Sequence, residues 1–183
     1  MPGKAITPQT VIDFWHKAGT ERWFRKDDTF DAEIRHSFLS LWQKAAADGL
    51  RDWRMNDAGL LALILVLDQF PRNMFREDPR AFSTDSLARE TAHLVLQQQA
   101  DTRTDKQLRG FLYLPFEHSE DMADQQLSLR LFHQLGDAEM LRFAEIHADI
   151  IRRFGRFPHR NAVLDRQTTR EEQKFLDEGG FAG

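Results

Sequence analysis

The chain has 183 residues, which is enough for one domain with a substantial core and short for two. Its 41% of hydrophobic and 30% of charged residues are typical of a soluble globular protein, and its net charge of −4 argues against a general electrostatic binder of nucleic acid. Cysteine is absent, which excludes disulfides, thiolate nucleophiles and cysteine-ligated metals and is consistent with a cytoplasmic protein.

The sequence contains no segment that resembles a membrane or targeting segment. Residues 1–8 lack the apolar core that a signal peptide requires. The longest apolar run, residues 58–67, is about half of the roughly 20 residues that a membrane-spanning helix needs, and Asp68 ends it. This run predicts a buried helix that is apolar on all sides, and no membrane partner.

Helical signals begin near the N-terminus and recur along the chain. Thr7 followed by Pro8 predicts a helix N-cap with proline at the first helical position. Apolar residues spaced by three and four carry this helix to Gly19, where it should end. The same spacing predicts a second helix from about Thr29 to Gly49.

The apolar run is predicted to form the next helix, with Asn56 as its N-cap. This helix should stop at Phe70-Pro71, because proline cannot continue a helix and disfavours the α conformation of the residue before it. Ser83 or Thr84 is the expected cap of the helix that follows.

Four more helices complete the chain. Thr104 is expected to open one, Ser119 to begin another that ends at Gly136, and residues 139–154 to form the next. Residues 168–171 have the Thr-x-x-Glu pattern of a capping box before the last helix.

No stretch shows the alternation of a β-strand, and no long linker divides the chain. The sequence therefore predicts an all-α protein, a single domain over residues 1–183, with about eight helices stacked as helical hairpins.

Two helix ends share almost the same sequence. They are Phe70-Pro71-Arg72-Asn73 and Phe157-Pro158-His159-Arg160-Asn161. Arginine offers a rigid fork of donors that fits a carboxylate or phosphate, and asparagine adds a donor and an acceptor. The same residues could equally satisfy the last carbonyls of a helix. The repetition does not distinguish ligand binding from helix capping, because a repeated structural unit would repeat its cap.

An acidic segment and a basic segment complement each other. Four carboxylates fall within residues 117–124, and six arginines fall within residues 152–170. One interpretation is a buried arginine–carboxylate network that acts as a structural lock, and another is a solvated charged face. A third is a polar pocket in which Arg72, Arg156 and Arg160 hold an anion while Glu117, His118 and His159 are candidates for proton transfer. The ligand-binding candidates in that pocket are Arg72, Asn73, Asp121, Arg156, Arg160 and Asn161.

Metal and cofactor motifs are not apparent. Residues 90–93 form a single Glu-x-x-His motif, whereas a ferritin-like di-iron site needs two. A site from His118, His147 and His159 has no support from spacing, and His147 is better interpreted as a hydrogen-bonded core histidine. No nucleophile elbow, P-loop or dinucleotide fingerprint occurs. We therefore expect neither a metal nor a cofactor.

Several longer motifs connect these segments to a known family. They are residues 11–15 (Val-Ile-Asp-Phe-Trp), 23–24 (Trp-Phe) with 30–31 (Phe-Asp), 67–73 (Leu-Asp-Gln-Phe-Pro-Arg-Asn), 80–82 (Arg-Ala-Phe) with 84–85 (Thr-Asp), 111–115 (Phe-Leu-Tyr-Leu-Pro) leading into 117–121 (Glu-His-Ser-Glu-Asp), 153–161 (Arg-Phe-Gly-Arg-Phe-Pro-His-Arg-Asn) and 179–181 (Gly-Gly-Phe). Through them the chain resembles the mainly bacterial domain-of-unknown-function family number 924. The resemblance implies a fold similar to tetratricopeptide-repeat-like superhelices, and no reaction or catalytic residue.

Two functional hypotheses follow. In the first, the two Phe-Pro motifs and the acidic segment converge on a small anionic or zwitterionic ligand, either to bind it or to act on it. In the second, the protein is a scaffold whose helical hairpins bind a peptide or protein partner, and the polar motifs are structural locks.

Overall fold

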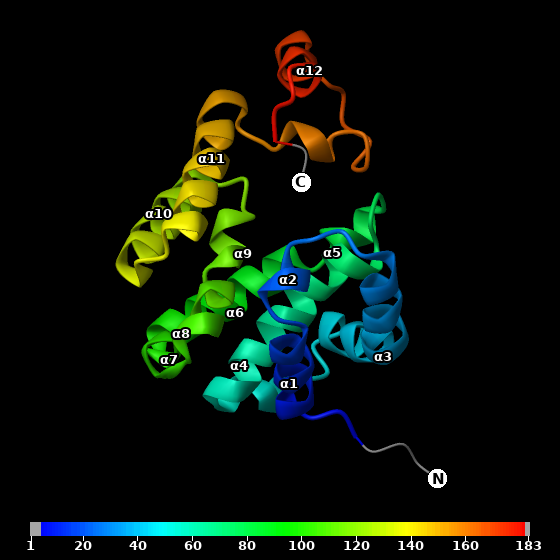
Figure 1. The fold of residues 1–183 in the computed structure, drawn as a ribbon, viewed down its shortest axis with the longest axis vertical. Coiled ribbons are helices and arrows are strands. Elements are labelled where there is room, and N and C mark those ends of the chain that lie inside the picture. Colours follow the sequence, from blue (N-terminus) through cyan, green and yellow to red (C-terminus); the bar gives the residue numbers. More distant parts are fainter. Residues whose placement is uncertain (1–4, 182–183) are drawn as a thin grey trace. The chain divides into compact units, whose positions relative to one another are not determined.

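The computed structural model describes residues 5–181, and every regular element in this range is helical, which confirms the all-α class (Figure 1). The chain divides into two compact units. Unit 1 contains the residues up to Arg76 and Arg80–Pro115, and unit 2 contains Glu77–Pro79 and the residues from Phe116 onward.

Unit 1 is built around long helices linked by short helical turns. Its elements are α1 (Pro8–Ala18), α2 (Thr20–Trp23), α3 (Asp28–Ala46), η1 (Arg51–Met55), α4 (Asp57–Ile64), η2 (Leu65–Gln69), α5 (Phe70–Met74), α6 (Asp85–Gln97), α7 (Ala100–Arg103), α8 (Lys106–Arg109) and η4 (Gly110–Leu112). Helix α4 packs against α1 and α6, and α3 packs against α5. The indole of Trp15 lies 5.9, 5.7 and 5.5 Å from the rings of Phe30, Phe70 and Phe111, so an aromatic cluster fills the core.

Unit 2 begins within α9 (Leu114–Glu117) and contains one long helical hairpin. Its further elements are α10 (Met122–Leu135), α11 (Ala138–Phe154), η5 (Pro158–Arg160) and α12 (Arg170–Asp177). Helix α10 packs along α11 (Figure 1), and the turn between them passes through Gly136 in the left-handed conformation, with φ of 71°. Helix α12 packs against η5. The tetratricopeptide-like superhelix stays a prediction.

Two of the predicted helix caps are confirmed. The Thr7 hydroxyl accepts a hydrogen bond from the Thr10 amide, and the Asn56 side chain accepts one from the Gly59 amide at 2.9 Å. Four other helix starts were placed one or two residues away from their true caps. The side chains that accept the capping hydrogen bonds are Asp27, Asp105, Asp121 and Thr169, in place of Thr29, Thr104, Ser119 and Thr168. In three of the four the cap is an aspartate, whose charged carboxylate is favoured at the positive end of a helix.

The predicted stop at Phe70-Pro71 is wrong. The chain continues from α4 through the π-helical turn η2 into α5, and Phe70 has helical angles of φ −59° and ψ −40°. The Phe70 amide donates to the Leu65 carbonyl five residues back, as a π turn requires. In an α-helix the amide at position 71 would donate to the Leu67 carbonyl, but Pro71 has no N–H. The Thr84 hydroxyl donates to this carbonyl instead, at 2.6 Å. The proline is tolerated here because Thr84 supplies the missing donor.

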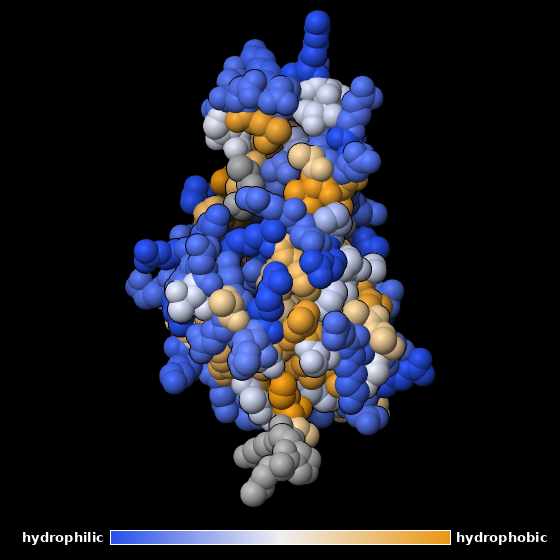
Figure 2. All heavy atoms as spheres, turned by 90° about the vertical axis from the view of Figure 1, so that its right-hand side faces the viewer, coloured by the Kyte–Doolittle hydropathy of each residue, from blue (hydrophilic) through white to orange (hydrophobic). Residues whose placement is uncertain are grey.

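Hydrophilic residues cover most of the face seen in Figure 2, with apolar side chains exposed between them. Within residues 5–181, no helix is both long enough and apolar enough to cross a membrane.

Candidate functional site

The first Phe-Pro motif lies in unit 1 and its arginine is engaged with two carboxylates. Arg72 donates through both terminal nitrogens to Asp85, at 2.9 and 3.1 Å, and lies 3.3 Å from a carboxylate oxygen of Asp68. Asp68 is 0% exposed. Burial opposes the charge of Arg72, but the two carboxylates raise its pKa above the ordinary value. This arrangement is a buried ion cluster of the kind that the structural-lock interpretation describes.

The asparagine of the same motif is held by a third acidic residue. Asn73 donates to a carboxylate oxygen of Asp31 at 2.8 Å, and the other oxygen of Asp31 is paired with Arg76. Asp31 lies in α3, so this contact joins α5 to α3. The polar side chains of the first motif therefore tie helices of unit 1 together.

In unit 2, two of the predicted ligand-binding residues converge on one buried carboxylate. Arg156 donates to both oxygens of Glu172, at 2.6 and 2.8 Å, and Asn161 donates to the second oxygen at 3.2 Å. The Thr169 amide adds a fourth hydrogen bond at 2.7 Å. Arg156 in particular holds the pKa of Glu172 at about 2. Sequence reasoning missed Glu172, although it is the glutamate of the true capping box.

A second ion pair holds the loop between η5 and α12, and it joins Arg166 of this loop to Glu120. Arg166 donates to the two oxygens of Glu120 at 2.7 and 3.0 Å, and the Phe157 amide donates to Glu120 at 2.8 Å. Burial raises the pKa of Glu120, but these hydrogen bonds bring it below its ordinary value. Asp121, a predicted ligand-binding residue, is exposed and caps α10 by accepting the Ala123 amide at 2.7 Å.

The remaining candidates of unit 2 form a group that we call the histidine cluster. It consists of Glu117, His118, His147, His159 and Arg160. Arg160 donates to the His118 carbonyl at 3.0 Å, Glu117 lies 3.3 Å from a ring nitrogen of His147, and the rings of His118 and His147 are 6.2 Å apart. Three elements supply these residues, namely the end of α9 with the turn after it, α11 and η5.

Two phenylalanines border the histidine cluster. Phe157 lies 5.3 Å from the ring of His147 and 5.7 Å from that of His159, and the guanidinium of Arg160 lies 4.5 Å above the Phe157 ring. Phe181 lies 4.6 Å from His147 and 5.5 Å from His159. The imidazoles thus stand between two aromatic rings.

His147 is the most deeply buried histidine of the cluster, at 5% exposure. Its Nδ1 lies 2.8 Å from the Phe143 carbonyl, which confirms the expected hydrogen-bonded core histidine. Burial, followed by the positive charge of His118, lowers the pKa of His147 to about 3. At neutral pH the ring is neutral and carries its proton on Nδ1, because a carbonyl can only accept; Nε2 is then the basic atom.

The other four members of the histidine cluster differ in solvent exposure. Glu117 and Arg160 are 3% and 6% exposed, whereas His118 and His159 are partly exposed. Across the described residues, no three His, Asp or Glu side chains are arranged to hold a metal ion.

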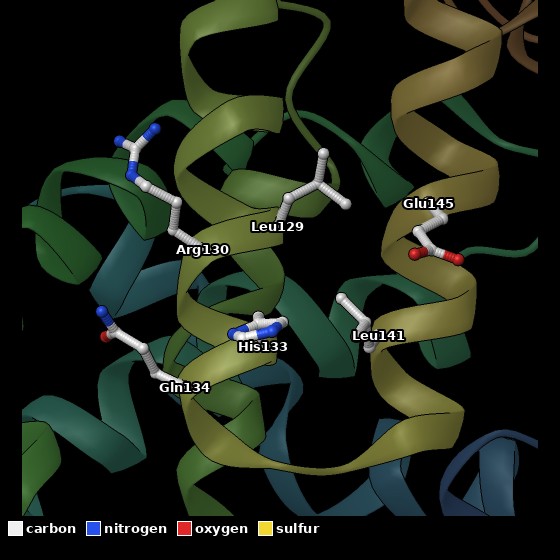
Figure 3. Close-up of a pocket in the computed structure, with 6 residues that line it drawn as sticks. All are labelled: Leu129, Arg130, His133, Gln134, Leu141 and Glu145. Carbon is white, nitrogen blue, oxygen red and sulfur yellow. The ribbon is translucent and has the colours of Figure 1, made fainter.

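A shallow groove of about 410 Å³ lies on the α10–α11 hairpin (Figure 3). Leu129 and Leu141 point toward each other from the two helices, and His133 and Glu145 lie beside them (Figure 3). The groove has an apolar floor and polar edges.

The family of bacterial proteins of unknown function called DUF924 matches residues 11–180. The chain belongs to this family. It is also similar to a solved structure of a protein of unknown function from Agrobacterium tumefaciens, with 44% sequence identity and a TM-score of 0.91, covering 94% of this chain and 97% of that one. No curated protein matches the chain.

The DUF924 match spans both Phe-Pro motifs and the whole histidine cluster. It also confirms the family resemblance carried by the sequence motifs. Within this DUF924 protein the candidate residues fall into two kinds. Arg72, Asn73, Arg156 and Asn161 make contacts with carboxylates of their own unit, and the histidine cluster groups bases, an acid and a cation around aromatic rings.

Proposed function

We propose that unit 2 binds a small anionic or zwitterionic molecule at the histidine cluster. The observation that carries this proposal is the grouping of a buried arginine, Arg160, with a buried neutral imidazole, His147, and two partly exposed imidazoles. Packing alone does not require this grouping, since each of these polar groups costs free energy to bury.

Each group has a definite chemical use in such a site. The guanidinium of Arg160 offers the positive charge and forked donors that a carboxylate or phosphate requires. Glu117, whose carboxylate lies beside His147, can accept the ammonium group of a zwitterion. His118 and His159 are on the accessible side and can exchange protons with a bound molecule, with His147 behind them as a neutral acceptor.

The proposal gives the other predicted residues a supporting role. Arg156 and Asn161 fix Glu172, and this anchors α12 next to η5, which carries His159 and Arg160. Arg72 and Asn73 belong to the ion cluster of unit 1.

A thermal-shift screen tests the proposal. The probes are inorganic phosphate, short carboxylic acids and amino acids, applied to the wild type, to Arg160→Gln and to Arg152→Gln. Arg152 is a matched control, because it is a 61% exposed arginine of unit 2 that pairs with Asp149. A probe at about 100 times its dissociation constant should stabilise the protein by about 2.7 kcal/mol. For this chain length the melting temperature then rises by about 5–10 °C.

We expect at least one probe to raise the melting temperature of the wild type and of Arg152→Gln, and not that of Arg160→Gln. Circular dichroism verifies that each variant is folded. If Arg160→Gln does not fold, His159→Gln takes its place, since His159 is partly exposed. A shift that persists in the folded variant, or no shift with any probe in the wild type, contradicts the proposal.

A second candidate function is the peptide scaffold, and the groove between α10 and α11 is the observation that favours it. Its floor of Leu129 and Leu141 between polar edges fits the apolar face of an amphipathic peptide. Amphipathic helical peptides that stabilise the wild type and Arg160→Gln equally, and that fail to stabilise Leu141→Glu, would favour the scaffold over the ligand site.

A further inference from the structure

The last described residues form a short segment, Gly179–Phe181, which we call the C-terminal strap. It follows α12 and reverses direction at Gly179, whose φ is +80°, a left-handed value that favours glycine. The Gly179 amide donates to Leu176 and the Gly180 amide donates to Phe175 at 2.9 Å. These bonds end the helix and turn the strap back along it.

Gly180 is required by a close approach. A Cβ atom at this position would lie 2.5 Å from the Phe175 carbonyl oxygen and 2.5 Å from its ring. Phe175 is itself fixed against Phe154 of α11, with ring centroids 5.2 Å apart. In this closed arrangement the strap therefore passes close to Phe175, and only a glycine fits at position 180.

This path places the Phe181 ring on the histidine cluster. The ring meets the imidazole of His147 at 4.6 Å and that of His159 at 5.5 Å, both in edge-to-face geometry. It also packs on the small apolar core formed by Ile150, Ile151 and Phe157. Phe181 is itself only partly buried, whereas the His147 that it contacts is 5% exposed.

We propose that the C-terminal strap is a hinged cover of the histidine cluster: when closed, Phe181 keeps water away from His147, and when open, it admits a ligand. The strap is held by its glycine turn, by the hydrogen bond from the Gly180 amide and by the packing of the Phe181 ring, so opening breaks these contacts and leaves the hydrogen bonds within α11 and α12 in place. The surface that Phe181 covers includes the imidazole rings of His147 and His159 and the phenyl ring of Phe157. The ligand admitted is then an anion that carries a ring, and this last point rests on the function proposed above.

The covering role has a spectroscopic test that needs no ligand. The groups that face His147 are Glu117, His118, His159 and Arg160, together with the Phe143 carbonyl on its own helix. None of them is altered in Phe181→Ala. In this variant the desolvation that dominates the pKa of His147 is relieved, so the pKa should rise from about 3 by one unit or more.

We would titrate the histidine rings by NMR in the wild type, in Phe181→Ala and in Phe24→Ala. Phe24 is the control, a phenylalanine of unit 1 that is 64% exposed. A raised pKa of His147 in Phe181→Ala alone supports the cover. An unchanged pKa in the folded variant overturns it. If Phe181→Ala does not fold, Gly180→Ala displaces the strap and removes no aromatic residue from the chain, and the same two outcomes apply.

The ligand class is tested separately with benzoate and acetate at equal concentration. Benzoate should raise the melting temperature of the wild type more than acetate does, because its ring can occupy the place of Phe181. Equal shifts would overturn the ring-bearing class. Failure of every anion would overturn the proposed function, whereas the titration of His147 would still decide on the cover.

Discussion

The two Phe-Pro motifs have nearly the same sequence, but they differ in backbone conformation and in the partners of their arginines. In unit 1, Phe70 is helical, and the proline after it lies inside a helix that continues to Met74. In unit 2, Phe157 is extended, with φ −88° and ψ 109°, and the proline after it begins the short helix η5. The first arginine is bound by two carboxylates, and the second donates to a carbonyl and lies over an aromatic ring.

One inserted histidine is the main difference in sequence between the two motifs. In the motif of unit 1 the arginine directly follows the proline, whereas in unit 2 His159 separates Pro158 from Arg160. The insertion shifts the arginine by one position along η5, toward the His118 carbonyl. A short motif therefore predicts a helix end and a charged group, while its neighbours decide which partners that group contacts.

The largest effect should come from breaking the ion cluster of unit 1. Replacing Arg72 with glutamine removes a guanidinium charge that lies 3.3 Å from the carboxylate of Asp68, which is 0% exposed. Removing one partner from a buried ion pair costs about 3–5 kcal/mol, and we expect the free energy of unfolding to fall by about 3 kcal/mol. Urea denaturation at pH 7 measures it.

Arg103→Gln is the matched control for this change. Arg103 forms a comparable two-bond pair with Asp57, at 2.7 and 2.8 Å, but its side chain is 52% exposed. The denaturation midpoint should hardly move, because solvent screens such pairs. Equal losses in the two variants would show that the ion cluster of unit 1 is not a buried lock.

A smaller effect should come from Glu172, the carboxylate on which Arg156 and Asn161 converge in unit 2. Its folded pKa of about 2 lies below the ordinary 4.5, so its stabilising contribution is complete above pH 4.5 and is lost as pH falls toward 2. Glu172→Gln should therefore lower the free energy of unfolding by about 2 kcal/mol at pH 7.

The pH dependence separates this prediction from a general loss of packing. The difference between the wild type and Glu172→Gln, measured by urea denaturation, should shrink between pH 5 and pH 2.5. Glu171→Gln, the exposed neighbour on the same helix, should show neither effect. A difference that stays constant with pH would mean that the charge of Glu172 is not what anchors α12.

Local patterns predicted the helices well and their boundaries less well. The apolar spacing and the caps at Thr7 and Asn56 depend on neighbouring residues only, so the sequence alone could identify them. The continuation through Phe70 could not be predicted, because the donor to the Leu67 carbonyl is the hydroxyl of Thr84, a residue 17 positions away in the turn before α6.

The candidate site divides in the same way. Residue types and their clustering correctly indicated arginine–carboxylate networks, but only the structure shows which carboxylate pairs with which arginine. Glu172 and Glu120 receive the arginines of the C-terminal segment, whereas Asp121, the residue favoured by sequence, only caps a helix. Phe181 stands out in the sequence solely as part of a family motif, because aromatic contacts between distant residues leave no local signal.

The smallest effect, and the sharpest comparison of the two motifs, comes from their prolines. Phe157 is extended, which is the conformation that a proline favours in the residue before it. Pro158→Ala therefore acts mainly by raising the conformational entropy of the unfolded chain, and it should lower the free energy of unfolding by about 0.5–1 kcal/mol. Pro71→Ala frees the unfolded chain equally, but it also relieves the conflict with a helical Phe70 and adds a good helix former. Its stability should stay within about 0.5 kcal/mol of the wild type. Calorimetry of both variants in one buffer decides: if Pro71→Ala loses as much stability as Pro158→Ala, Pro71 puts no strain on the π turn.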